Sequence, residues 1–384
     1  MECVLCGNKD MSYFYKGHKG YYCRRCIGFS RVLLEEEPKS LEYEIGEGVD
    51  EYRFSYELTD IQKEASSRCA SLIDSHDVLL HCVCGAGKTE ISVASLGHYL
   101  KRGLKVAYAI SRKEVVIELE RRFSAIFPKA RVVAVYGGHH ELLTGDLIVC
   151  TTHQLYRFYK SFDLLVIDEA DAFPLKGNET LMNIAINSCR GHIIFSTATV
   201  DDGLRKIIER RSCEKVEVFT RPSNRPLTMP RIMRMNKVFG MLMLIYLVVR
   251  MKGQCIVFMP SKKECMHMFR LISLFRKCTY AYSDLDRRDD NIKDFRDGKY
   301  QFIASTLVLE RGITIKDVNV IICDYIEGIF DESNLIQMLG RVGRGIDSSC
   351  GKAYILTDRY GKKIRNVIRY LKEANSHLEM PILR

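Results

Sequence analysis

The feature that most constrains the fold of this chain is an apolar run that leads into a glycine-containing turn and then into a helical pattern. The run is Asp77–Val83, and the turn that follows it contains Gly85, Gly87, Lys88 and Thr89. A strand, a turn and a helix start in this order form a phosphate-binding loop, because backbone N–H groups and the helix dipole both favour an anion there. In such a loop the lysine reaches the β- and γ-phosphates, and the threonine hydroxyl binds Mg²⁺. The sequence therefore predicts an α/β lobe that binds a nucleoside triphosphate.

One position of this loop departs from the eight-residue phosphate-loop template. Cys82 stands where the template has its first glycine, whereas the Gly-x-Gly-Lys-Thr ending is intact. Taken alone, the segment is also compatible with a surface turn ahead of an amphipathic helix. The phosphate-loop interpretation therefore depends on the motifs that follow it.

Length and composition exclude several classes of protein. With 384 residues, 47% of them hydrophobic, the chain can build two or three domains with cores of their own. The longest apolar candidate, Val238–Val249, is shorter than the run of about 18 residues that a membrane span needs, and we predict a buried helix there. The first residues lack the regions of a signal peptide. Fifteen cysteines, an odd number spread through strand-like runs, favour a reducing compartment, so we expect a cytoplasmic protein.

The net charge of +10 is unevenly distributed along the sequence. From Glu35 to Glu57 there are nine acidic residues against Lys39 and Arg53, so the remainder, with 56 basic and 39 acidic residues, carries +17. A basic body favours a polyanionic partner, most simply nucleic acid. A well-solvated surface explains the charge equally well.

The N-terminal segment contains two pairs of cysteines, Cys3 with Cys6 and Cys23 with Cys26, with sixteen residues between the pairs. This spacing is typical of a zinc ribbon, in which four thiolates surround a tetrahedral ion. We predict a zinc finger over residues 1–30, since a segment this small needs a metal to fold. Its tyrosines and basic residues are suited to stack on single-stranded bases, or equally to form the only core of the finger.

Beyond an acidic linker at residues 31–56, short β-branched runs alternate with helical stretches in two series. The first series comprises Val106–Ile110, Val132–Tyr136, Asp146–Thr151, Leu164–Asp168 and His192–Ser196. The second comprises Cys255–Met259, Tyr280–Tyr282, Phe302–Ser305, Val318–Cys323 and Ala353–Leu356. This alternation is typical of parallel sheets covered by helices. We predict an α/β fold with two lobes, residues 57–219 and 220–384, and a helix that begins near Thr59 or Asp60.

The strand candidate Leu164–Asp168 ends in carboxylates. Parallel strands end at the same edge of a sheet, so an Asp there can hold Mg²⁺ beside the phosphate loop, and the next Glu can orient the attacking water. We assign Asp168 to the metal and Glu169 to the water. The following strand ends in hydroxyls that are placed to sense these carboxylates and relay their state. These are Ser196, Thr197 and Thr199.

The second lobe contains two segments rich in glycine and arginine. Glu310, Arg311 and Gly312 follow one strand candidate, and Gln337 precedes the segment Gly340–Arg344. An arginine supplied by a second lobe neutralises the charge that develops on a phosphate during transfer. On its own, such a segment is equally compatible with a basic turn. Together with the phosphate loop and the carboxylates, it indicates an ATP-hydrolysing site.

In this order, Gly-Ala-Gly-Lys-Thr, Asp-Glu-Ala-Asp, Ser-Thr-Ala-Thr, Glu-Arg-Gly and Gln-x-x-Gly-Arg-x-Gly-Arg resemble the motifs of a DEAD-box-like superfamily 2 helicase or translocase over residues 55–360. The cysteine module ahead of them, with Ser111–Val116, Cys150–Leu155 and Leu307–Gly312, more narrowly resembles the ComFA family of late competence DNA-uptake ATPases. Ser111 stands where that family usually has proline. The resemblance implies two RecA-like lobes behind a zinc-binding finger, with ATP, Mg²⁺ and Zn²⁺ as ligands.

The resemblance also implies roles for individual residues. Those that would bind or hydrolyse ATP are Gln62, Gly85, Gly87, Lys88, Thr89, Asp168, Glu169, Gln337, Arg341 and Arg344. Those that would contact the nucleic-acid backbone are Arg112, Gly138, Thr151, Thr152 and Thr306. Those that would couple the two activities are Ser196, Thr197, Thr199, Glu310, Arg311 and Gly312.

By resemblance, the chain is a single-stranded-DNA-stimulated ATPase that drives the uptake of transforming DNA during natural competence. Its implied partners are single-stranded DNA, a membrane DNA-uptake channel and the phosphoribosyltransferase-like competence protein ComFC. The resemblance leaves undecided whether the chain forms a homo-oligomer. The implied location is the inner face of the membrane, reached through partners. The alternatives are a repair or replication-restart helicase, an RNA helicase, or a nucleotide-switched DNA-binding assembly factor. Gln337 and Ser-Thr-Ala-Thr favour a DNA enzyme, because RNA-dedicated DEAD-box proteins usually carry His-Arg-x-Gly-Arg and Ser-Ala-Thr.

Overall fold

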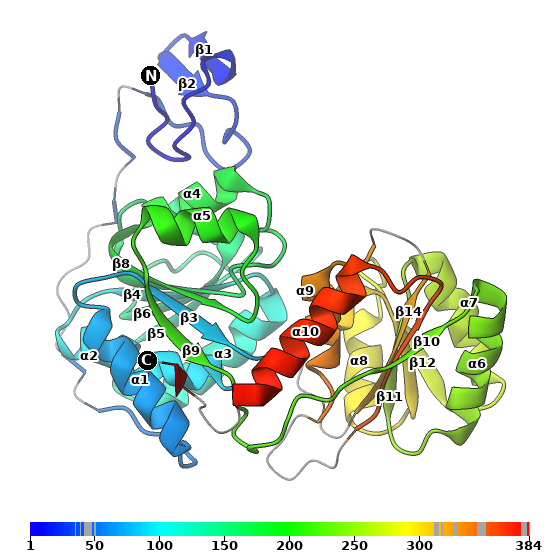
Figure 1. Cartoon of the computed structure of the whole chain (residues 1–384). Coiled ribbons are helices and arrows are strands. Elements are labelled where there is room, and N and C mark those ends of the chain that lie inside the picture. Colours follow the sequence, from blue (N-terminus) through cyan, green and yellow to red (C-terminus); the bar gives the residue numbers. More distant parts are fainter. Residues whose placement is uncertain are drawn as a thin grey trace. The chain divides into compact units, whose positions relative to one another are not determined.

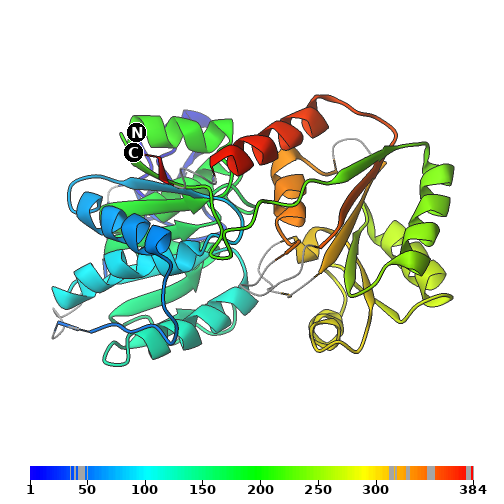
Figure 2. The ribbon, with the colours of Figure 1, turned by 60° about the horizontal axis from the view of Figure 1, so that its bottom comes forward.

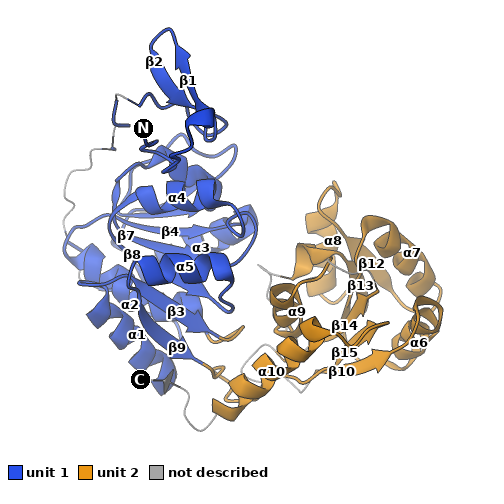
Figure 3. Ribbon diagram, turned by 45° about the horizontal axis from the view of Figure 1, so that its top comes forward, with its two compact units in different colours: residues 1–82, 87–218, 382–384 blue, residues 83–86, 219–381 orange. Residues whose placement is uncertain are grey.

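The structure is a computed structural model that describes residues 1–34, 36–38, 40–41, 48–49, 51–310, 315, 318–325, 329–343, 351–377 and 382–383. It divides into two compact units, which Figure 3 colours blue and orange. Unit 1 consists of residues 1–82, 87–218 and 382–384, and unit 2 of residues 83–86 and 219–381. Among the described residues, no helix is both long and apolar enough to cross a membrane.

Unit 1 begins with a small finger whose regular structure is a short 3-10 turn, Met11–Tyr13, and one hairpin. The hairpin strands β1 (Phe14–Gly17) and β2 (Gly20–Cys23) pair antiparallel, with Phe14 opposite Cys23. The core of the finger contains the four cysteines together with Leu5 and Val32. Two strands of four residues cannot bury enough apolar surface to hold themselves together, so the sulfur cluster has to contribute.

The main body of unit 1 is a sheet with the strand order β16-β9-β3-β8-β7-β4-β6-β5. Its pairs are parallel except β16 with β9. The strands are β3 (Val78–Cys82), β4 (Val106–Ile110), β5 (Val132–Val135), β6 (Leu147–Thr151), β7 (Phe162–Asp168), β8 (Cys189–Thr197), β9 (Glu214–Val218) and β16 (Ile382–Leu383). The helices are α1 (Asp60–Leu72), α2 (Lys88–Lys101), α3 (Lys113–Ile126), α4 (Glu179–Asn187) and α5 (Asp202–Arg210), with a 3-10 segment η2 (Thr152–Arg157).

Helices cover both faces of this sheet. Figure 1 shows α4 and α5 on one side and α1, α2 and α3 on the other. The α4 and α5 side encloses a continuous apolar core that includes Leu181 of α4, Leu204 of α5 and Phe195 of β8. On the other side, Phe123 of α3 packs against Tyr108 of β4. Because both faces are buried, the strands are apolar at nearly every position, as parallel strands generally are.

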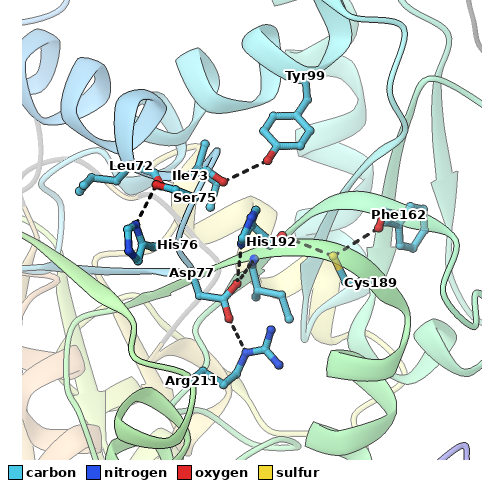
Figure 4. A network of polar contacts seen from close by, with 11 residues as sticks. Leu72, Ile73, Ser75, His76, Asp77, Tyr99, Phe162, Cys189, His192 and Arg211 are labelled. Atoms are coloured by element: carbon cyan, nitrogen blue, oxygen red, sulfur yellow. Dashed lines mark hydrogen bonds and ion pairs between the residues drawn. The ribbon is translucent and has the colours of Figure 1, made fainter.

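A buried carboxylate, Asp77, fixes the amino end of β3. Figure 4 shows its two oxygens accepting from different segments of unit 1. One accepts the backbone N–H of Ile193 at 2.7 Å, and the other accepts from the guanidinium of Arg211. The backbone carbonyl of Asp77 also accepts the N–H of Glu214 at 2.8 Å. These bonds hold β3, β8 and β9 in register, which positions the phosphate loop at the opposite end of β3.

Unit 2 contains a six-stranded parallel sheet of order β10-β15-β14-β11-β13-β12. The strands are β10 (Arg231–Arg234), β11 (Cys255–Phe258), β12 (Cys278–Ala281), β13 (Phe302–Ser305), β14 (Asn319–Asp324) and β15 (Ala353–Thr357). The helices are α6 (Lys237–Arg250), α7 (Lys262–Ser273), α8 (Arg288–Arg296), α9 (Glu332–Leu339) and α10 (Lys362–Ser376), with a 3-10 turn η3 (Leu307–Leu309). Helices α6 and α7 share one apolar core with the sheet, and Figures 1 and 2 show α10 alongside α9.

The predicted fold class of two parallel-sheet α/β lobes is confirmed, and each of the ten expected strand runs overlaps an observed strand. Thr59 caps α1, and its side chain and that of Gln62 form a reciprocal capping box. Strands β9 and β10 were not expected, because charged residues in Glu214–Val218 and Arg231–Arg234 hide the apolar pattern.

The expectation of a buried helix at Val238–Val249 is half wrong. The helix forms as α6, but Val238, Phe239, Leu242, Tyr246 and Val249 are exposed. A helix that is apolar on every side has no polar face to mark its outward direction. Its sequence therefore gives no sign that only one side packs against the sheet.

Candidate nucleotide and nucleic-acid site

The phosphate loop takes a backbone path that only glycine adopts easily. Gly85 and Gly87 have φ of +85° and +90°, and Gly87 is the residue on which α2 begins. A Cβ atom on Gly87 would lie 2.2 Å from the amide nitrogen of Gln62. Both the left-handed φ and this close approach exclude a larger residue. The loop therefore leads into the N-terminus of α2, with Lys88 and Thr89 in its first turn.

Gln62 links the start of α1 to this loop. Its side-chain oxygen accepts the backbone N–H of Thr59 at 3.1 Å. Gln62 is buried, and its amide nitrogen is the group that the Cβ on Gly87 would meet. The residue that we assign to the nucleotide base therefore also fixes the start of α1.

A tyrosine joins the two residues assigned to Mg²⁺. The Tyr108 hydroxyl donates to Asp168 Oδ2 at 2.8 Å and lies 3.5 Å from the Thr89 hydroxyl oxygen. Burial, and then the charge of Asp168, raise the pKa of Tyr108 well above its ordinary value. Tyr108 therefore stays protonated and acts as a donor to the carboxylate.

These residues fit a magnesium ion. Thr89 and Asp168 share the Tyr108 hydroxyl as a neighbour, and they offer a hydroxyl and a carboxylate oxygen. Mg²⁺ prefers such oxygen ligands, and it is generally held by only one or two protein groups plus phosphate oxygens and waters.

The Asp-Glu-Ala-Asp segment is bonded to the strand that follows it in the sequence. Ser196 donates to Asp168 Oδ1 at 2.9 Å, and Thr197 donates to Asp171 Oδ1 at 2.7 Å. Thr199 also donates to Asp171. A shift of these carboxylates would therefore displace the hydroxyls at the end of β8, as a role in coupling ATP hydrolysis to nucleic-acid binding requires.

Glu169, which lies between the two aspartates, has a φ of +55°. A non-glycine residue in this region costs of the order of 1–2 kcal/mol and is uncommon. The backbone N–H of Glu169 donates to Asp168 Oδ1 at 2.9 Å, which helps to hold the turn. Asp168 and Glu169 therefore occupy consecutive positions at the carboxyl end of β7, where the strained turn holds their backbone.

Four of the residues assigned to nucleic acid lie at the carboxyl ends of three neighbouring parallel strands in unit 1. Arg112 follows β4, Thr151 ends β6, and Gly138 lies in the turn after β5 with a φ of +79°. Thr152 begins η2, but its side chain is fully buried, so a contact there would come from the backbone. Thr306, the fifth, follows β13 of unit 2.

In unit 2 the structure brings Glu310 and Arg341 together. Arg341 is buried, and its Nε donates to the backbone carbonyl of Glu310 at 3.0 Å. Gln337 on α9 is also buried, and its Nε2 has no hydrogen-bond partner among the described residues. A nucleotide that reaches this helix would meet an amide donor. The assigned residues Arg311, Gly312 and Arg344 lie outside the described residues.

An arginine that the sequence reading missed holds the end of α9. Arg221 is buried, and its guanidinium donates to the carbonyls of Gly340 at 3.0 Å, Val342 at 2.8 Å and Gly343 at 3.3 Å. The last carbonyls of a helix have no partner within the helix, and a cation there is favoured. Arg221 therefore positions the segment that carries Arg341.

The finger brings its four cysteines into one buried cluster. Their sulfur atoms all lie within 4.8 Å of one another. Cys3 and Cys26 are 3.6 Å apart, and Cys6 and Cys23 are 3.8 Å apart. Zn–S bonds of about 2.3 Å in a tetrahedron place the sulfurs about 3.8 Å apart, so the cluster fits zinc. The hydrogen bond between Cys3 and Cys26 lowers the pKa of Cys3 and raises the pKa of Cys26, so it is the geometry of the four sulfur atoms that supports zinc.

The finger is attached to α4 of unit 1. Asn187 donates to the carbonyls of Val4 at 3.1 Å and Leu5 at 3.0 Å, and Asn183 donates to the carbonyl of Cys6 at 3.0 Å. Ile184, which lies between these asparagines in the helix, belongs to the core of the finger. These contacts orient one end of the cysteine cluster against unit 1.

A second contact joins the finger to η2. Phe29 stacks on His153 and also packs on Tyr156, with ring centroids 6.3 and 6.1 Å apart. The finger therefore adjoins the segment that begins with Thr152, one of the residues assigned to nucleic acid.

The open question about the aromatic residues of the finger is answered by their burial. Tyr13 and Tyr15 are exposed, whereas Tyr22 is buried. Arg25 lies 5.8 Å from the ring centre of Tyr13, and Arg24 lies 5.3 Å from that of Tyr15. Tyr13 and Tyr15 are therefore not the core of the finger but part of an exposed basic and aromatic surface.

The sequence reading missed Tyr108, Arg221 and the two asparagines of α4. Tyr108 carried a weak signal, as a hydroxyl in an otherwise apolar strand. Arg221 lies in the polar segment interpreted as a boundary, where a buried cation is not expected. Asn183 and Asn187 lie one helical turn apart and so share a face, but nothing in the sequence indicates their partners.

Comparison with known proteins identifies both units. The family model described as DEAD/DEAH box helicase matches residues 59–207, and the helicase conserved C-terminal domain matches residues 239–345. The chain is 28% identical to competence protein ComFA of Streptococcus pneumoniae, over 97% of this chain and 90% of that one. It is also 28% identical to competence protein ComFA of Bacillus subtilis, over 97% of this chain and 85% of that one.

The fold is shared more widely. Saccharomyces cerevisiae Dbp5 bound to RNA and ADP BeF3 superposes with a TM-score of 0.62 at 18% identity, over 82% of this chain and 87% of that one. The two helicase family models and the ComFA relatives together show that the chain is an ATP-hydrolysing enzyme of the helicase type.

Proposed function

The chain belongs to the ComFA family of superfamily 2 helicases, and from this premise we propose that it is an ATP-driven motor on single-stranded DNA. In this proposal it draws transforming DNA into the cytoplasm during natural competence. The observation that carries the proposal is the bonded path from Thr89 through Tyr108 and Asp168 to Ser196. Such a path lets the state of the γ-phosphate reach the rest of the unit, which a motor requires.

Each residue has a task in this mechanism. Lys88 would bind the β- and γ-phosphates, and Thr89 and Asp168 would hold Mg²⁺, which would shield the negative charge of these phosphates. Glu169 orients the attacking water. Arg341 and Arg344 neutralise the charge that develops on the transferred phosphoryl group. Gln62 and Gln337 complete the nucleotide contacts.

Nucleic acid would be held through its backbone. Arg112, Gly138, Thr151 and Thr152 lie at one edge of the unit 1 sheet, and we propose that they follow the phosphates of a single strand together with Thr306. Contacts of this kind are independent of sequence and weaken steeply with salt. The exposed basic and aromatic surface of the finger would add stacking on bases.

We also propose partners by resemblance to the family. These are a membrane DNA-uptake channel and the phosphoribosyltransferase-like protein ComFC, which would bring the chain to the inner face of the membrane. The shared fold does not choose between DNA and RNA, because the similar fold of Dbp5 is seen with RNA.

The test is steady-state ATP hydrolysis without nucleic acid and with single-stranded DNA, duplex DNA or RNA, at low and moderate salt. We expect single-stranded DNA to stimulate turnover about tenfold more than RNA, with the stimulation lost as salt rises. Equal stimulation by RNA would favour an RNA helicase. Turnover that no nucleic acid accelerates would favour a nucleotide-switched assembly factor.

A pair of lysine variants makes this test specific to the phosphate loop. Lys88→Ala should lower turnover by about a hundredfold or more, because the phosphates lose their main cation, while the fold is kept. Lys101→Ala, at the other end of α2, should keep normal turnover. Normal hydrolysis by Lys88→Ala would remove the assignment of the loop.

A further inference from the structure

Helix α6 presents apolar side chains to solvent along a complete stripe. Its inward side packs on the sheet of unit 2 through Leu244, Leu247 and Val248. The outward residues are exposed by 44% to 70%, and they are Val238, Phe239, Leu242, Tyr246 and Val249. At spacings of three and four residues, most of these form one line along the helix. A helix that is apolar all round is normally buried, so the exposed stripe indicates a surface that something else covers.

Helix α7 lies beside α6 and widens this surface. At their amino ends Lys237 of α6 pairs with Glu264 of α7. At the other end Arg276 donates to the carbonyls of Val248 and Val249, the latter at the end of α6. Figures 1 and 3 show the two helices next to each other at the side of unit 2.

The end of α7 continues the apolar stripe. Leu274, the C-cap of α7, is 76% exposed, and Phe275 is exposed as well. Both precede Arg276, whose contact with α6 brings them near Val249. Exposed apolar side chains therefore occur both on α6 and at the end of α7, and Arg276 joins the two helices between them.

The segment that contains α6 and α7 is strongly basic. Residues 237–277 contain eight Lys and Arg residues and one carboxylate, Glu264, so this segment carries a charge of +7. Seven of these cations are exposed, and they are Lys237, Arg250, Lys252, Lys262, Lys263, Arg270 and Lys277. Exposed apolar side chains and exposed cations thus occur together.

From this coincidence we infer that the outer surface of α6 and α7 docks on an anionic lipid bilayer. An interfacial helix buries apolar side chains at the boundary of the acyl chains, while Lys and Arg beside it meet lipid phosphates. Tyr246 is suited to the same boundary, because its ring is apolar and its hydroxyl is polar. Nucleic acid would satisfy the cations but not Val238, Leu242 or Leu274.

The length of α6 agrees with docking rather than spanning. It has 14 residues, whereas a membrane-crossing helix needs about 20. The helix would lie in the plane of the interface with its inner side still packed on the sheet. This would place unit 2 against the lipid without any partner protein. The inference of lipid docking does not depend on whether the chain acts on DNA.

The experiment is flotation of the full-length, zinc-loaded chain with vesicles of phosphatidylcholine alone, or of phosphatidylcholine containing about one third phosphatidylglycerol. We expect the protein to float with the anionic vesicles and to stay behind with the neutral ones. Phe239→Glu with Leu242→Glu should lower the bound fraction about tenfold, because both charges would enter the apolar boundary. Leu142→Glu, an exposed leucine of unit 1, should float like the unchanged protein.

Two results would overturn the inference. One is that the unchanged protein fails to float with anionic vesicles. This result includes the case in which light scattering shows that the unchanged protein is a dimer and the α6 double variant is a monomer. A second copy of the chain would then cover α6. The other is equal flotation of the α6 double variant and the unchanged protein. The double variant should keep its nucleic-acid-stimulated ATP hydrolysis, so failure of lipid docking and failure of the proposed motor are separately visible.

Discussion

Helices α4 and α6 are both largely apolar, and both cover a parallel sheet, but they differ in what lies on their outward sides. On α4, Ile184 is buried in the core of the finger, and Asn183 and Asn187 bond to its backbone. On α6, the corresponding outward residues, such as Leu242 and Tyr246, are exposed.

The difference shows how an outward apolar side chain should be interpreted. On α4 the covering element is part of the same chain, and the polar side chains beside Ile184 match its backbone groups. On α6 a cation, Arg250, lies against Tyr246 of the apolar stripe, and the segment around the helix is basic, which suits an anionic surface rather than a folded backbone. The chemistry beside an apolar patch therefore indicates what covers it.

The strongest way to break this comparison is to remove the covering of α4. Cys26→Ser should lower bound zinc from one ion per chain to near zero, because three thiolates and a hydroxyl hold zinc poorly. We expect the finger to lose more than about 3 kcal/mol of stability. Metal analysis and hydrogen exchange of residues 3–26 measure both effects.

The matched control is Cys213→Ser, a half-buried cysteine outside the finger, which should keep its zinc. Unchanged zinc content in Cys26→Ser would show that the four sulfurs are not the metal site.

The two sides of α6 should differ next most strongly. Leu244→Ala removes a buried side chain and should lower the free energy of unfolding by about 3 kcal/mol. Leu242→Ala, half a turn away on the exposed side, should change it by less than about 0.5 kcal/mol. Urea unfolding of the two variants measures the contrast. Equal losses would show that the outward stripe is packed in solution.

The smallest expected effect concerns the hydrogen bonds by which α4 holds the finger. Asn187→Ala removes two hydrogen bonds to the carbonyls of Val4 and Leu5, and it should weaken attachment of the finger by about 1–2 kcal/mol. Faster proteolysis within residues 1–34, with normal zinc content, would report the loss. The control is Asn366→Ala on α10, which removes an exposed hydrogen bond to Glu332 of α9. If Asn187→Ala resists protease like the control, Ile184 and the zinc cluster hold the finger without it.

The regular parts of the fold were predictable from the sequence because they depend on local patterns. Apolar runs of four to seven residues marked the strands, and the glycines before Lys88 marked a loop whose φ values only glycine adopts easily. The cysteine pairs were predictable for the same reason, since their spacing within each pair is local. The pairing of Asp168 with Ser196 also followed from the neighbouring strand ends.

Partners that lie far apart in the sequence were not predictable. Tyr108 meets Asp168 because β4 and β7 are neighbours in a particular register, which the sequence does not state. Arg221 reaches the end of α9 across more than a hundred residues. The prediction that α6 is buried on its outward side failed for a different reason. A uniformly apolar helix carries no signal of which side faces solvent.

Helix α4 contributes to two cores at once. Leu181 and Ala185 face the sheet core of unit 1, while Ile184 faces the core of the finger. Separating the finger from the sheet would therefore expose Ile184, although α4 itself still has to cover the sheet. The finger and the sheet should then melt as one cooperative block rather than as a module on a support. For this enzyme, the metal content of a finger of about thirty residues would set the temperature at which the ATP-binding unit unfolds.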